Sequence, residues 1–292
     1  MQPPVIAVLD IGSNAMKYSI SEGDGTVLQF ERRETTHKGL NSSACLSEDH
    51  MAEIVSTAAV MKTHVETFCM ALGRPFFMLC VGTQIFRKAK NQDEMGLRFE
   101  KTLGMPLHVI SSRAEAEFEK LGSETSPTAQ QWKHKKIMLV DFGGGSTEFS
   151  WPFTSTAPFC LPVGKHDFKQ DYTFAALQAK FAPVRAYLSD HRPDCILLAG
   201  STAFAYARCL LPSGASSTAM EGMPLDYHEM GSQNRASQDV VWTALLGGSL
   251  VRFFQAVCPN AVYLTTYGLR HGIVAAYALG RDVLDRILYG AF

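Results

Sequence analysis

LVDFGGGSTE at residues 139–148 and VLDIGSN at residues 8–14 share one pattern. Each stretch is an apolar run that ends in an aspartate, Asp141 or Asp10, and continues into a turn of glycine and small polar residues. A strand buried in a sheet can hold the carboxylate rigidly at its end. Glycine lets the following backbone turn so sharply that its N–H groups crowd around an anion. The repeat therefore predicts two similar halves that bind a phosphate and a metal ion.

The two turns provide the first candidate ligands. A carboxylate beside such a turn suits a cation that bridges to phosphate oxygens, so Asp10 and Asp141 are candidate metal ligands. A lone aspartate at a strand end usually caps a turn, but two of them before similar turns favour the metal or phosphate role. The N–H groups and hydroxyls of the turns are expected to contact phosphate oxygens. The residues concerned are Gly12, Ser13, Asn14, Gly143, Gly144, Gly145, Ser146 and Thr147.

Length and composition exclude several classes of protein. The chain has 292 residues, 46% of them hydrophobic and 19% charged, as expected of a globular protein with room for two domains. A net charge of −1 excludes a strongly basic nucleic-acid binder on composition alone. No apolar run approaches the roughly 18 residues of a membrane helix, and the first residues lack the layout of a signal peptide. Seven scattered cysteines without a C-x-x-C indicate reduced thiols and a cytoplasmic location.

Hydrophobic periodicity and turn residues outline the order of elements. In the first half we expect a hairpin around Asp24-Gly25, a helix from Ser47 to Gly73 and a strand over 76–81. A helix over 114–121 is expected to stop at Gly122, and the polar segment 123–132 to form a hinge. The second half is expected to contain a helix over 174–188, a strand over 195–198, an irregular segment over 212–237, a helix over 240–257 and helices over 269–288.

Arg87 and Glu115 are candidates whose patterns leave two interpretations open. Arg87 follows a strand and a Gly-Thr turn, so its guanidinium could hold a phosphate through two hydrogen bonds, or it could begin a basic helix without a further role. Glu115 lies just after a strand, in the first turn of a helix, where the helix dipole favours a carboxylate. Position alone makes that structural role the better explanation. Glu117 and Glu119 are expected on the solvent face, and His271 at the surface or in a cap.

Five groups of residues, in this order, resemble one family. They are Asp10-Ile11-Gly12-Ser13-Asn14, Gly82-Thr83 with Arg87-Lys88-Ala89 and Asn91, Ile110-Ser111 with Glu115-Ala116, the segment 141–148, and Leu269-Arg270-His271-Gly272. Over essentially the whole chain the sequence resembles the short, two-domain form of the exopolyphosphatase/guanosine pentaphosphate phosphohydrolase (Ppx/GppA) family. The resemblance implies two similar α/β lobes of the actin/hexokinase/Hsp70-like (ribonuclease H-like) kind with a cleft between them. The first lobe is then expected over 1–125, completed by a carboxyl-terminal helix at about 275–292, and the second over 133–274.

The resemblance also implies roles for individual residues. Glu115 matches the family's catalytic glutamate, the general base that activates the attacking water, and Arg87 matches a phosphate-binding arginine. Asp141 and Glu148 match acidic residues that hold Mg²⁺. The first phosphate loop is matched by Asp10 and Asn14, and a third loop, which would hold a nucleotide or the far part of a substrate, by Gly200, Ser201 and Thr202.

The implied activity is Mg²⁺-dependent hydrolysis that releases terminal phosphate from polyphosphate, guanosine pentaphosphate or both. Two alternatives stay open: a sensor that binds such a phosphoanhydride without cleaving it, and a small-molecule kinase of the same superfamily, which normally has an aspartate base in place of Glu115. No specific nucleic acid and no membrane are expected as partners, and the family often forms dimers. Substrate preference and rate stay open because the chain departs from the family pattern at Ala15, Ser112, Ala114, Ser201 and His271.

Overall fold

The computed structural model of this protein describes residues 2–12, 15–36, 40–168, 171, 173–211, 220–227, 238–259 and 261–290, and it describes the side chains of all of these except 238–240. The chain forms two compact units. Unit 1 comprises Met1–Phe118 and Leu269–Phe292, and unit 2 comprises Glu119–Gly268. The chain therefore passes from one unit to the other twice, after Phe118 and after Gly268.

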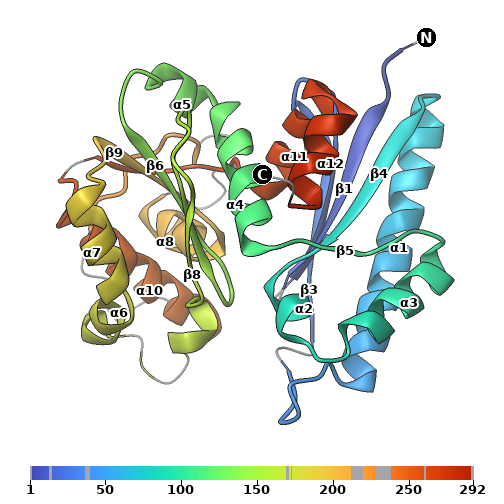
Figure 1. Ribbon diagram of the computed structural model, residues 1–292, viewed down its shortest axis with the longest axis horizontal. Coiled ribbons are helices and arrows are strands. Elements are labelled where there is room, and N and C mark those ends of the chain that lie inside the picture. Colours follow the sequence, from blue (N-terminus) through green and yellow to red (C-terminus); the bar gives the residue numbers. More distant parts are fainter. Residues whose placement is uncertain are drawn as a thin grey trace. The chain divides into compact units, whose positions relative to one another are not determined.

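Unit 1 is built on a mixed sheet with the strand order β3-β2-β1-β4-β5 (Figure 1). β1 and β2 form an antiparallel hairpin, whereas β4 and β5 run parallel to β1. β1 is buried along its whole length, which explains its uninterrupted apolar sequence. The hairpin and the strand expected over 76–81 are confirmed. The strands are β1 (Val5–Ile11), β2 (Ala15–Ser21), β3 (Val27–Glu34), β4 (Phe76–Gly82) and β5 (His108–Val109).

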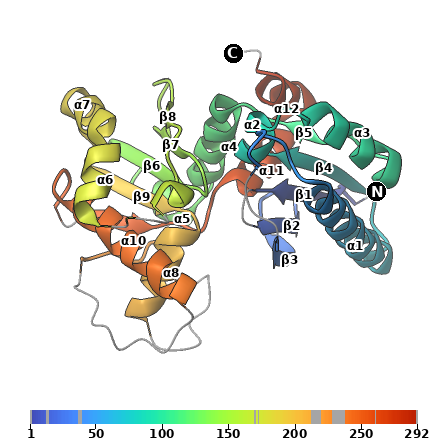
Figure 2. The same ribbon diagram turned by 90° about the horizontal axis from the view of Figure 1, so that it is seen from below.

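Helices cover both faces of this sheet. Val5, Ala7 and Leu9 of β1 share a core with residues of α1 (Glu48–Leu72) and α3 (Gln92–Leu103), and these two helices pack together (Figure 2). Because side chains alternate along a strand, Asp10 lies on the opposite face. On the opposite side, α11 (Leu269–Leu279) contacts β1 and is followed by α12 (Arg281–Leu288). The carboxyl-terminal helices thus belong to the same unit as the first strand.

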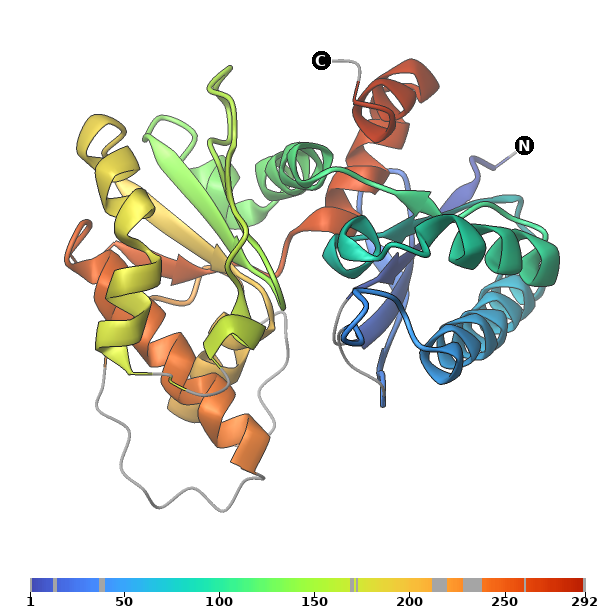
Figure 3. The same ribbon diagram turned by 60° about the horizontal axis from the view of Figure 1, so that its bottom comes forward.

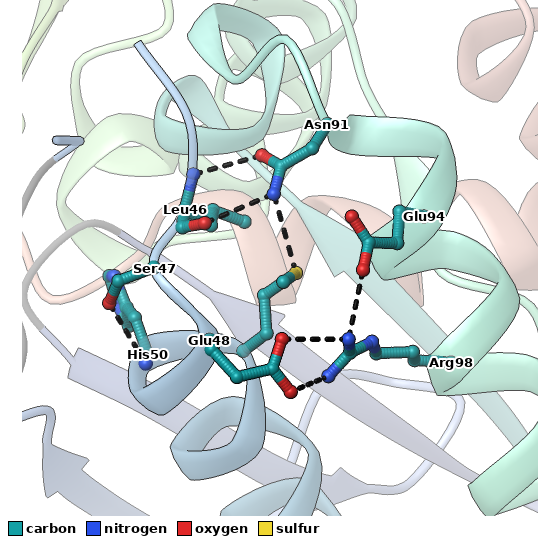
Figure 4. A network of polar contacts seen from close by, with 8 residues as sticks. Leu46, Ser47, Glu48, His50, Asn91, Glu94 and Arg98 are labelled. Atoms are coloured by element: carbon teal, nitrogen blue, oxygen red, sulfur yellow. Dashed lines mark hydrogen bonds and ion pairs between the residues drawn. The ribbon is translucent and has the colours of Figure 1, made fainter. Parts of the chain in front are cut away.

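The start of α1 is fastened to α3 by a network of polar contacts (Figure 4). The Arg98 guanidinium of α3 pairs with Glu48 in the first turn of α1 and with Glu94 one turn before it. The side chain of Asn91 accepts a hydrogen bond from Leu46 N (2.9 Å) and donates one to Leu46 O (3.0 Å). These contacts join the start of α1, and the segment before it, to α3.

Both ends of α1 lie where the sequence predicts them. Ser47 Oγ accepts a hydrogen bond from His50 N at 3.2 Å and so caps the first turn. Gly73 adopts the left-handed conformation, with φ of 63°, that ends the helix. The expected helix from Ser47 to Gly73 is confirmed.

Unit 2 repeats the architecture of unit 1. Its sheet has the order β10-β9-β6-β7-β8, in which β6, β7 and β8 pair antiparallel and β9 and β10 run parallel to β6. The fold expected from the sequence, two similar mixed α/β units, is therefore confirmed. The strands are β6 (Ile137–Phe142), β7 (Thr147–Ser150), β8 (Phe159–Leu161), β9 (Cys195–Ala199) and β10 (Val262–Leu264).

Helices of unit 2 pack on a core rich in aromatic side chains. α10 (Gln238–Gln255) runs along α6 (Phe174–Lys180), as Figure 3 shows in orange and yellow. It also packs against α8 (Ser201–Leu210), where a Cβ on Gly247 would lie 2.5 Å from the carbonyl oxygen of Thr202. The single helix expected over 174–188 is instead two, α6 and α7 (Ala182–Asp190), because Pro183 begins a new helix. The 3₁₀ helix η1 (Lys165–Phe168) precedes them.

The segment expected to form a hinge is folded. α4 (Ser112–Glu124) continues through Gly122 instead of stopping there, and α5 (Pro127–Gln131) follows after a short turn. Ser123 and Ser126 are fully buried, because their hydroxyls bond the backbone at Lys120 O and Ala129 N. Small hydroxyl residues that make such bonds can be buried, so polarity alone gave the wrong expectation.

Two findings bear on the classes of protein considered above. Among the described residues, no helix combines the length and the apolar character that crossing a membrane requires. All seven cysteines are free thiols. The expected irregular segment over 212–237 lies mostly outside the described residues.

Candidate functional site

Three parallel strands of unit 1 end at one edge of the sheet. Asp10 of β1 stands beside Val81 of β4, and the chain after each strand is tied to its neighbour. Thr83 N donates to Ile11 O at 3.2 Å, and Ile110 N donates to Gly82 O at 3.1 Å. Open α/β sheets bind their ligands outside the carboxyl ends of such strands.

Arg87 and Glu115 form an ion pair at this edge. Arg87 lies in α2 (Gln84–Lys88), directly after β4, and Glu115 lies in the first turn of α4. Arg87 Nη1 donates to Glu115 Oε2 at 2.7 Å and to the carbonyl oxygen of Ile110 at 3.0 Å. The two side chains are largely buried, with 17% and 13% of their surface exposed. Two residues whose roles the sequence left open are thus in direct contact.

Close backbone approaches hold this pair in place. A Cβ on Gly82 would lie 2.7 Å from the ring of Phe86, so glycine at the end of β4 lets the side chain of Phe86 pack directly on it. Ser111 Oγ caps α4 by accepting a hydrogen bond from Ala114 N at 3.1 Å. α11 also approaches α4 closely, because a Cβ on Gly272 would lie 1.6 Å from the carbonyl oxygen of Phe118.

Asp10 is buried between two cations. Its side chain is 7% exposed, and Oδ2 lies 3.3 Å from Lys17 Nζ and 3.5 Å from Arg270 Nη1. Lys17 stands directly opposite Asp10 on β2. Arg270 comes from the start of α11, and its guanidinium also lies over the ring of Phe30, 4.8 Å from the centroid. Two side chains of unit 1 therefore balance the negative charge of Asp10.

In unit 2 the corresponding aspartate stands opposite another carboxylate. Asp141 of β6 pairs in register with Glu148 of β7, so both side chains leave the same face of the sheet, with Cβ atoms about 5 Å apart. Like charges directly opposite each other destabilise an antiparallel pair. A shared cation removes this repulsion, and oxygen ligands of this kind are what Mg²⁺ prefers.

Glu119 is a further carboxylate that the sequence analysis placed wrongly. Glu119 and Glu148 are each 2% exposed, and a carboxylate oxygen of one lies within 4.8 Å of one of the other. Glu119 is therefore buried and not on the solvent face. It lies one turn after Glu115 in α4, so both side chains leave the same side of the helix. That spacing of four residues is the sequence signal that could have identified it.

Two glycines leave space around the carboxylate of Asp141. A Cβ on Gly200 would lie 2.7 Å from Asp141 Oδ1, and a Cβ on Gly268 would lie 3.8 Å from Oδ2. Gly200 also has a φ of 92°, which side chains rarely allow. The third loop expected at Gly200 therefore lies next to Asp141, at the point where β9 ends.

The two turns after the aspartates close in the same way. Gly12 N donates to Ala15 O at 3.1 Å, and Gly143 N donates to Ser146 O at 2.9 Å. In this structure these two N–H groups hold the turns together. Ser13 and Asn14 lie outside the described residues.

Two hydroxyl residues expected to contact phosphate, Thr147 and Thr202, have buried side chains in this structure. Thr147 Oγ1 donates to Val163 O at 2.6 Å, so its hydroxyl joins β7 to the segment before η1. Thr202 is fully buried in α8, where it packs against α10. Ser201, the residue before it, is exposed. A ligand at the start of α8 would therefore meet Ser201 and the backbone at Gly200.

His271, expected at the surface or in a cap, is half-buried in the first turn of α11. Burial, with a smaller contribution from the neighbouring Arg270 guanidinium, lowers the pKa of His271 to about 4. The imidazole is therefore neutral at pH 7. It lies beside the arginine that contacts Asp10.

Comparison with known proteins identifies similar sequences. The Ppx/GppA phosphatase family model matches residues 20–187. A Haemophilus influenzae protein provisionally named exopolyphosphatase is 29% identical over 148 residues, which are 49% of this chain and 43% of that protein. The match thus spans less than half the length of that relative.

Solved structures with the same fold cover nearly the whole chain. The Aquifex aeolicus PPX-GPPA enzyme has a TM-score of 0.74 at 22% identity, over 93% of this chain and 99% of that one. An exopolyphosphatase from Cytophaga hutchinsonii has a TM-score of 0.74 at 16% identity, over 96% and 99%. At these identities the likeness establishes a common fold. It confirms the architecture of two similar α/β units expected from the sequence.

Proposed function

This chain belongs to the Ppx/GppA phosphatase family, and from this membership we propose that it hydrolyses the terminal phosphoanhydride bond of polyphosphate, of guanosine pentaphosphate or of both. The observation that carries the proposal is the Arg87–Glu115 ion pair at the carboxyl ends of the unit 1 strands. It brings together a carboxylate that can accept a proton from water and a guanidinium that can bind a phosphoryl oxygen.

Glu115 is the proposed general base. An adjacent guanidinium stabilises the ionised form of a carboxylate, and only that form accepts a proton. The hydrogen bond from Arg87 Nη1 occupies Oε2 and fixes the orientation of the carboxylate. In phosphoryl transfer most of the rate enhancement comes from positioning and from charge stabilisation. A fixed base beside the bound phosphate meets the first of these needs.

Arg87 is the proposed phosphate ligand. Its Nη1 bonds Glu115 and Ile110, whereas its Nη2 is buried and has no hydrogen-bond partner among the residues that the structure describes. A buried N–H group without an acceptor costs about 1–3 kcal/mol. A phosphoryl oxygen at Nη2 would remove that cost and would place the phosphorus near the base.

Mg²⁺ is assigned to unit 2 in this proposal. The residues there fit the ion, because Asp141 and Glu148 stand opposite each other and glycines leave space around the Asp141 carboxylate. Glu119 beside Glu148 adds negative charge at the same place. Bound Mg²⁺ would neutralise charge on the phosphate oxygens. In unit 1, Lys17 and Arg270 already neutralise Asp10, so this proposal places the metal at Asp141 and Glu148.

The remaining turn residues are proposed to bind the phosphate chain. Gly144, Gly145 and Ser146 form the tip of the turn after Asp141, and Ser201 follows Gly200 at the start of α8. A Cβ on Gly164 would lie 2.5 Å from Gly145 N and 2.6 Å from Ser146 N. Glycine at position 164 therefore lets its own segment pack directly on this turn, where Lys165 N donates to Gly143 O at 3.0 Å and His166 N donates to Gly144 O at 2.8 Å.

Phosphate release from polyphosphate, guanosine pentaphosphate and ATP, with and without Mg²⁺, tests this function. The wild-type chain should release phosphate from at least one of the first two and need Mg²⁺ for it. Glu115→Gln should lose about 10²- to 10⁴-fold in kcat and keep its affinity for the substrate. Glu117→Gln, the same change two residues further along α4, is the matched control and should keep full activity.

Three other results would contradict parts of the proposed function. Full activity in Glu115→Gln removes Glu115 from the mechanism. Tight binding of guanosine pentaphosphate or polyphosphate without release of phosphate by the wild-type chain would indicate a sensor instead of an enzyme. Transfer of phosphate from ATP to a hydroxyl would indicate a kinase.

A further inference from the structure

We propose that Glu221 is a positioning residue, which fixes the segment Thr265–Gly268 beside the carboxylate of Asp141. The proposal rests on the proposed function in one respect, the assignment of Asp141 as a ligand of Mg²⁺. Glu221 lies in a part of the chain whose sequence suggested only an irregular segment. Its contacts show a defined role in unit 2.

A single carboxylate gathers three donors from two consecutive residues. Glu221 Oε2 accepts hydrogen bonds from Thr266 N at 2.6 Å and from Thr266 Oγ1 at 3.1 Å. The hydroxyl of Thr265 lies 3.1 Å from Oε2 and 3.3 Å from Oε1. Thr265 Oγ1 in turn accepts a hydrogen bond from Tyr267 N at 3.2 Å. The turn that follows β10 is therefore bonded to one side chain at two consecutive residues.

Glu221 is itself held rigidly against β10. Gly222 N donates to Leu264 O at 2.9 Å, and Leu264 N donates to Met223 O at 2.8 Å. Leu225 N donates to Val262 O at 2.8 Å, so the segment continues along the strand. Gly222, with a φ of 73°, passes so close to α5 that a Cβ there would lie 2.6 Å from Thr128 Oγ1. The carboxylate is thus presented from a fixed backbone.

The segment that Glu221 holds lies beside the proposed metal ligand. Thr265 is fully buried, and its N–H donates to Leu198 O at 2.9 Å, which joins the turn to β9. Three residues later, a Cβ on Gly268 would lie 3.8 Å from Asp141 Oδ2. A shift of this segment would change the space and the polar surroundings of that oxygen. Residues that orient a metal ligand typically change metal affinity about 10- to 100-fold when they are replaced.

Glu221 is distinct from the carboxylates that would hold the metal. Its oxygens accept hydrogen bonds from the hydroxyls of Thr265 and Thr266 and from the N–H of Thr266, and three such bonds need an acceptor with two oxygens. Glutamine offers one oxygen, and its NH₂ cannot accept. Glu221→Gln therefore removes part of the network while it preserves the size of the side chain.

The experiment measures hydrogen exchange and Mg²⁺ affinity on the full chain. Exchange of a peptide that covers 262–270, followed by mass spectrometry, should accelerate at least about tenfold in Glu221→Gln and more in Glu221→Ala. Calorimetric titration with Mg²⁺ alone should show affinity about 10-fold weaker. The Mg²⁺ concentration for half-maximal phosphate release should rise by the same factor, while the KM for polyphosphate should stay within about twofold.

Glu124→Gln is the matched control. Glu124 is a half-buried carboxylate of unit 2 that also accepts a backbone hydrogen bond, from Phe153 N at 2.7 Å, away from the Asp141 turn. Its replacement should leave exchange over 262–270 and Mg²⁺ affinity unchanged. Urea unfolding of each variant separates loss of the fold from loss of position. If Glu221→Ala does not fold, the hydrogen exchange and Mg²⁺ affinity of Glu221→Gln alone test the proposal.

Two results would overturn the proposal. One is unchanged exchange over 262–270 in Glu221→Gln, and the other is faster exchange with wild-type Mg²⁺ affinity. The failure of the proposed function looks different, because a wild-type chain that releases no phosphate can still bind Mg²⁺ and show the effect of Glu221. A wild-type chain that binds no Mg²⁺ removes the role of Asp141, and the proposal for Glu221 with it.

Discussion

The hairpin β1–β2 of unit 1 and the hairpin β6–β7 of unit 2 have the same backbone plan and opposite electrostatics. In each, an aspartate near the end of a buried strand precedes a glycine whose N–H closes the turn. The residue directly opposite the aspartate is Lys17 in unit 1 and Glu148 in unit 2. One hairpin contains an ion pair, and the other contains two carboxylates on the same face.

The difference shows that similar strand–turn motifs need not have similar ligands. Asp10 has its charge balanced by Lys17 and Arg270 within unit 1. Asp141 stands opposite Glu148, whose carboxylate is itself within 4.8 Å of that of Glu119. Three acidic groups on neighbouring elements favour an added cation. The comparison therefore supports the proposal that Mg²⁺ is held by unit 2 and not by Asp10.

The largest expected effect separates the two aspartates by their response to Mg²⁺. Asp141→Asn should raise the Mg²⁺ concentration for half-maximal phosphate release by about 100-fold or more, because it removes a proposed ligand. Asp10→Asn should leave that concentration unchanged, but it should lower the free energy of unfolding by about 2–4 kcal/mol because two cations lose their buried partner. Mg²⁺ titrations of activity and urea unfolding check both. Equal loss of Mg²⁺ affinity in the two variants would mean that Asp10 and Asp141 do not differ in their role toward the metal.

A smaller effect distinguishes the two cations that face Asp10. Arg270→Gln should destabilise the chain by about 1–2 kcal/mol, because its side chain is only 17% exposed and it also covers Phe30. Lys17 is 34% exposed, so Lys17→Gln should cost less than about 1 kcal/mol. Urea unfolding at low ionic strength measures both. A larger loss for Lys17→Gln would mean that the hairpin partner, and not α11, neutralises Asp10.

The pH dependence of the free energy of unfolding tests the burial of His271, the residue after Arg270. The pKa of His271 is lowered to about 4 in the folded chain, against about 6.5 when unfolded, so the unfolded chain binds more protons between these values. The stability contributed by the neutral imidazole is complete above pH 6.5 and is lost as the pH falls towards 4. The loss between pH 7 and pH 5 should be about 1–2 kcal/mol.

Replacement of the imidazole tests this assignment. His271→Gln should remove the loss of stability between pH 7 and pH 5 that the imidazole causes. Urea unfolding at several pH values measures this. If the variant loses as much stability as the wild-type chain, other groups cause the loss. One such group is His108, because burial lowers its pKa as well.

Several elements follow from local sequence alone. The hairpin turn at Asp24-Gly25, the cap at Ser47 and the end of α1 at Gly73 depend on residues within a few positions of one another. The residue patterns also identified the family and Arg87, Glu115 and Asp141 as candidates. Local patterns sufficed because turn and cap geometry is decided by the backbone preferences of the residues at that point.

Polarity is a poor guide to exposure at several positions of this chain. Glu119 was expected in solvent and is buried beside Glu148. Ser123 and Ser126 were expected in a hinge and lie inside folded structure. Each side chain is buried with polar neighbours that the local sequence does not reveal.

The sequence by itself determined the two strand–turn motifs, most of the helices and strands around them, and the family to which the chain belongs. Only the tertiary structure decided which charges meet: Arg87 with Glu115, Arg270 with Asp10, and Glu221 with Thr265 and Thr266. The reason is that a backbone conformation depends on neighbours in the chain, whereas the charge balance of a buried group depends on residues that folding brings from far away.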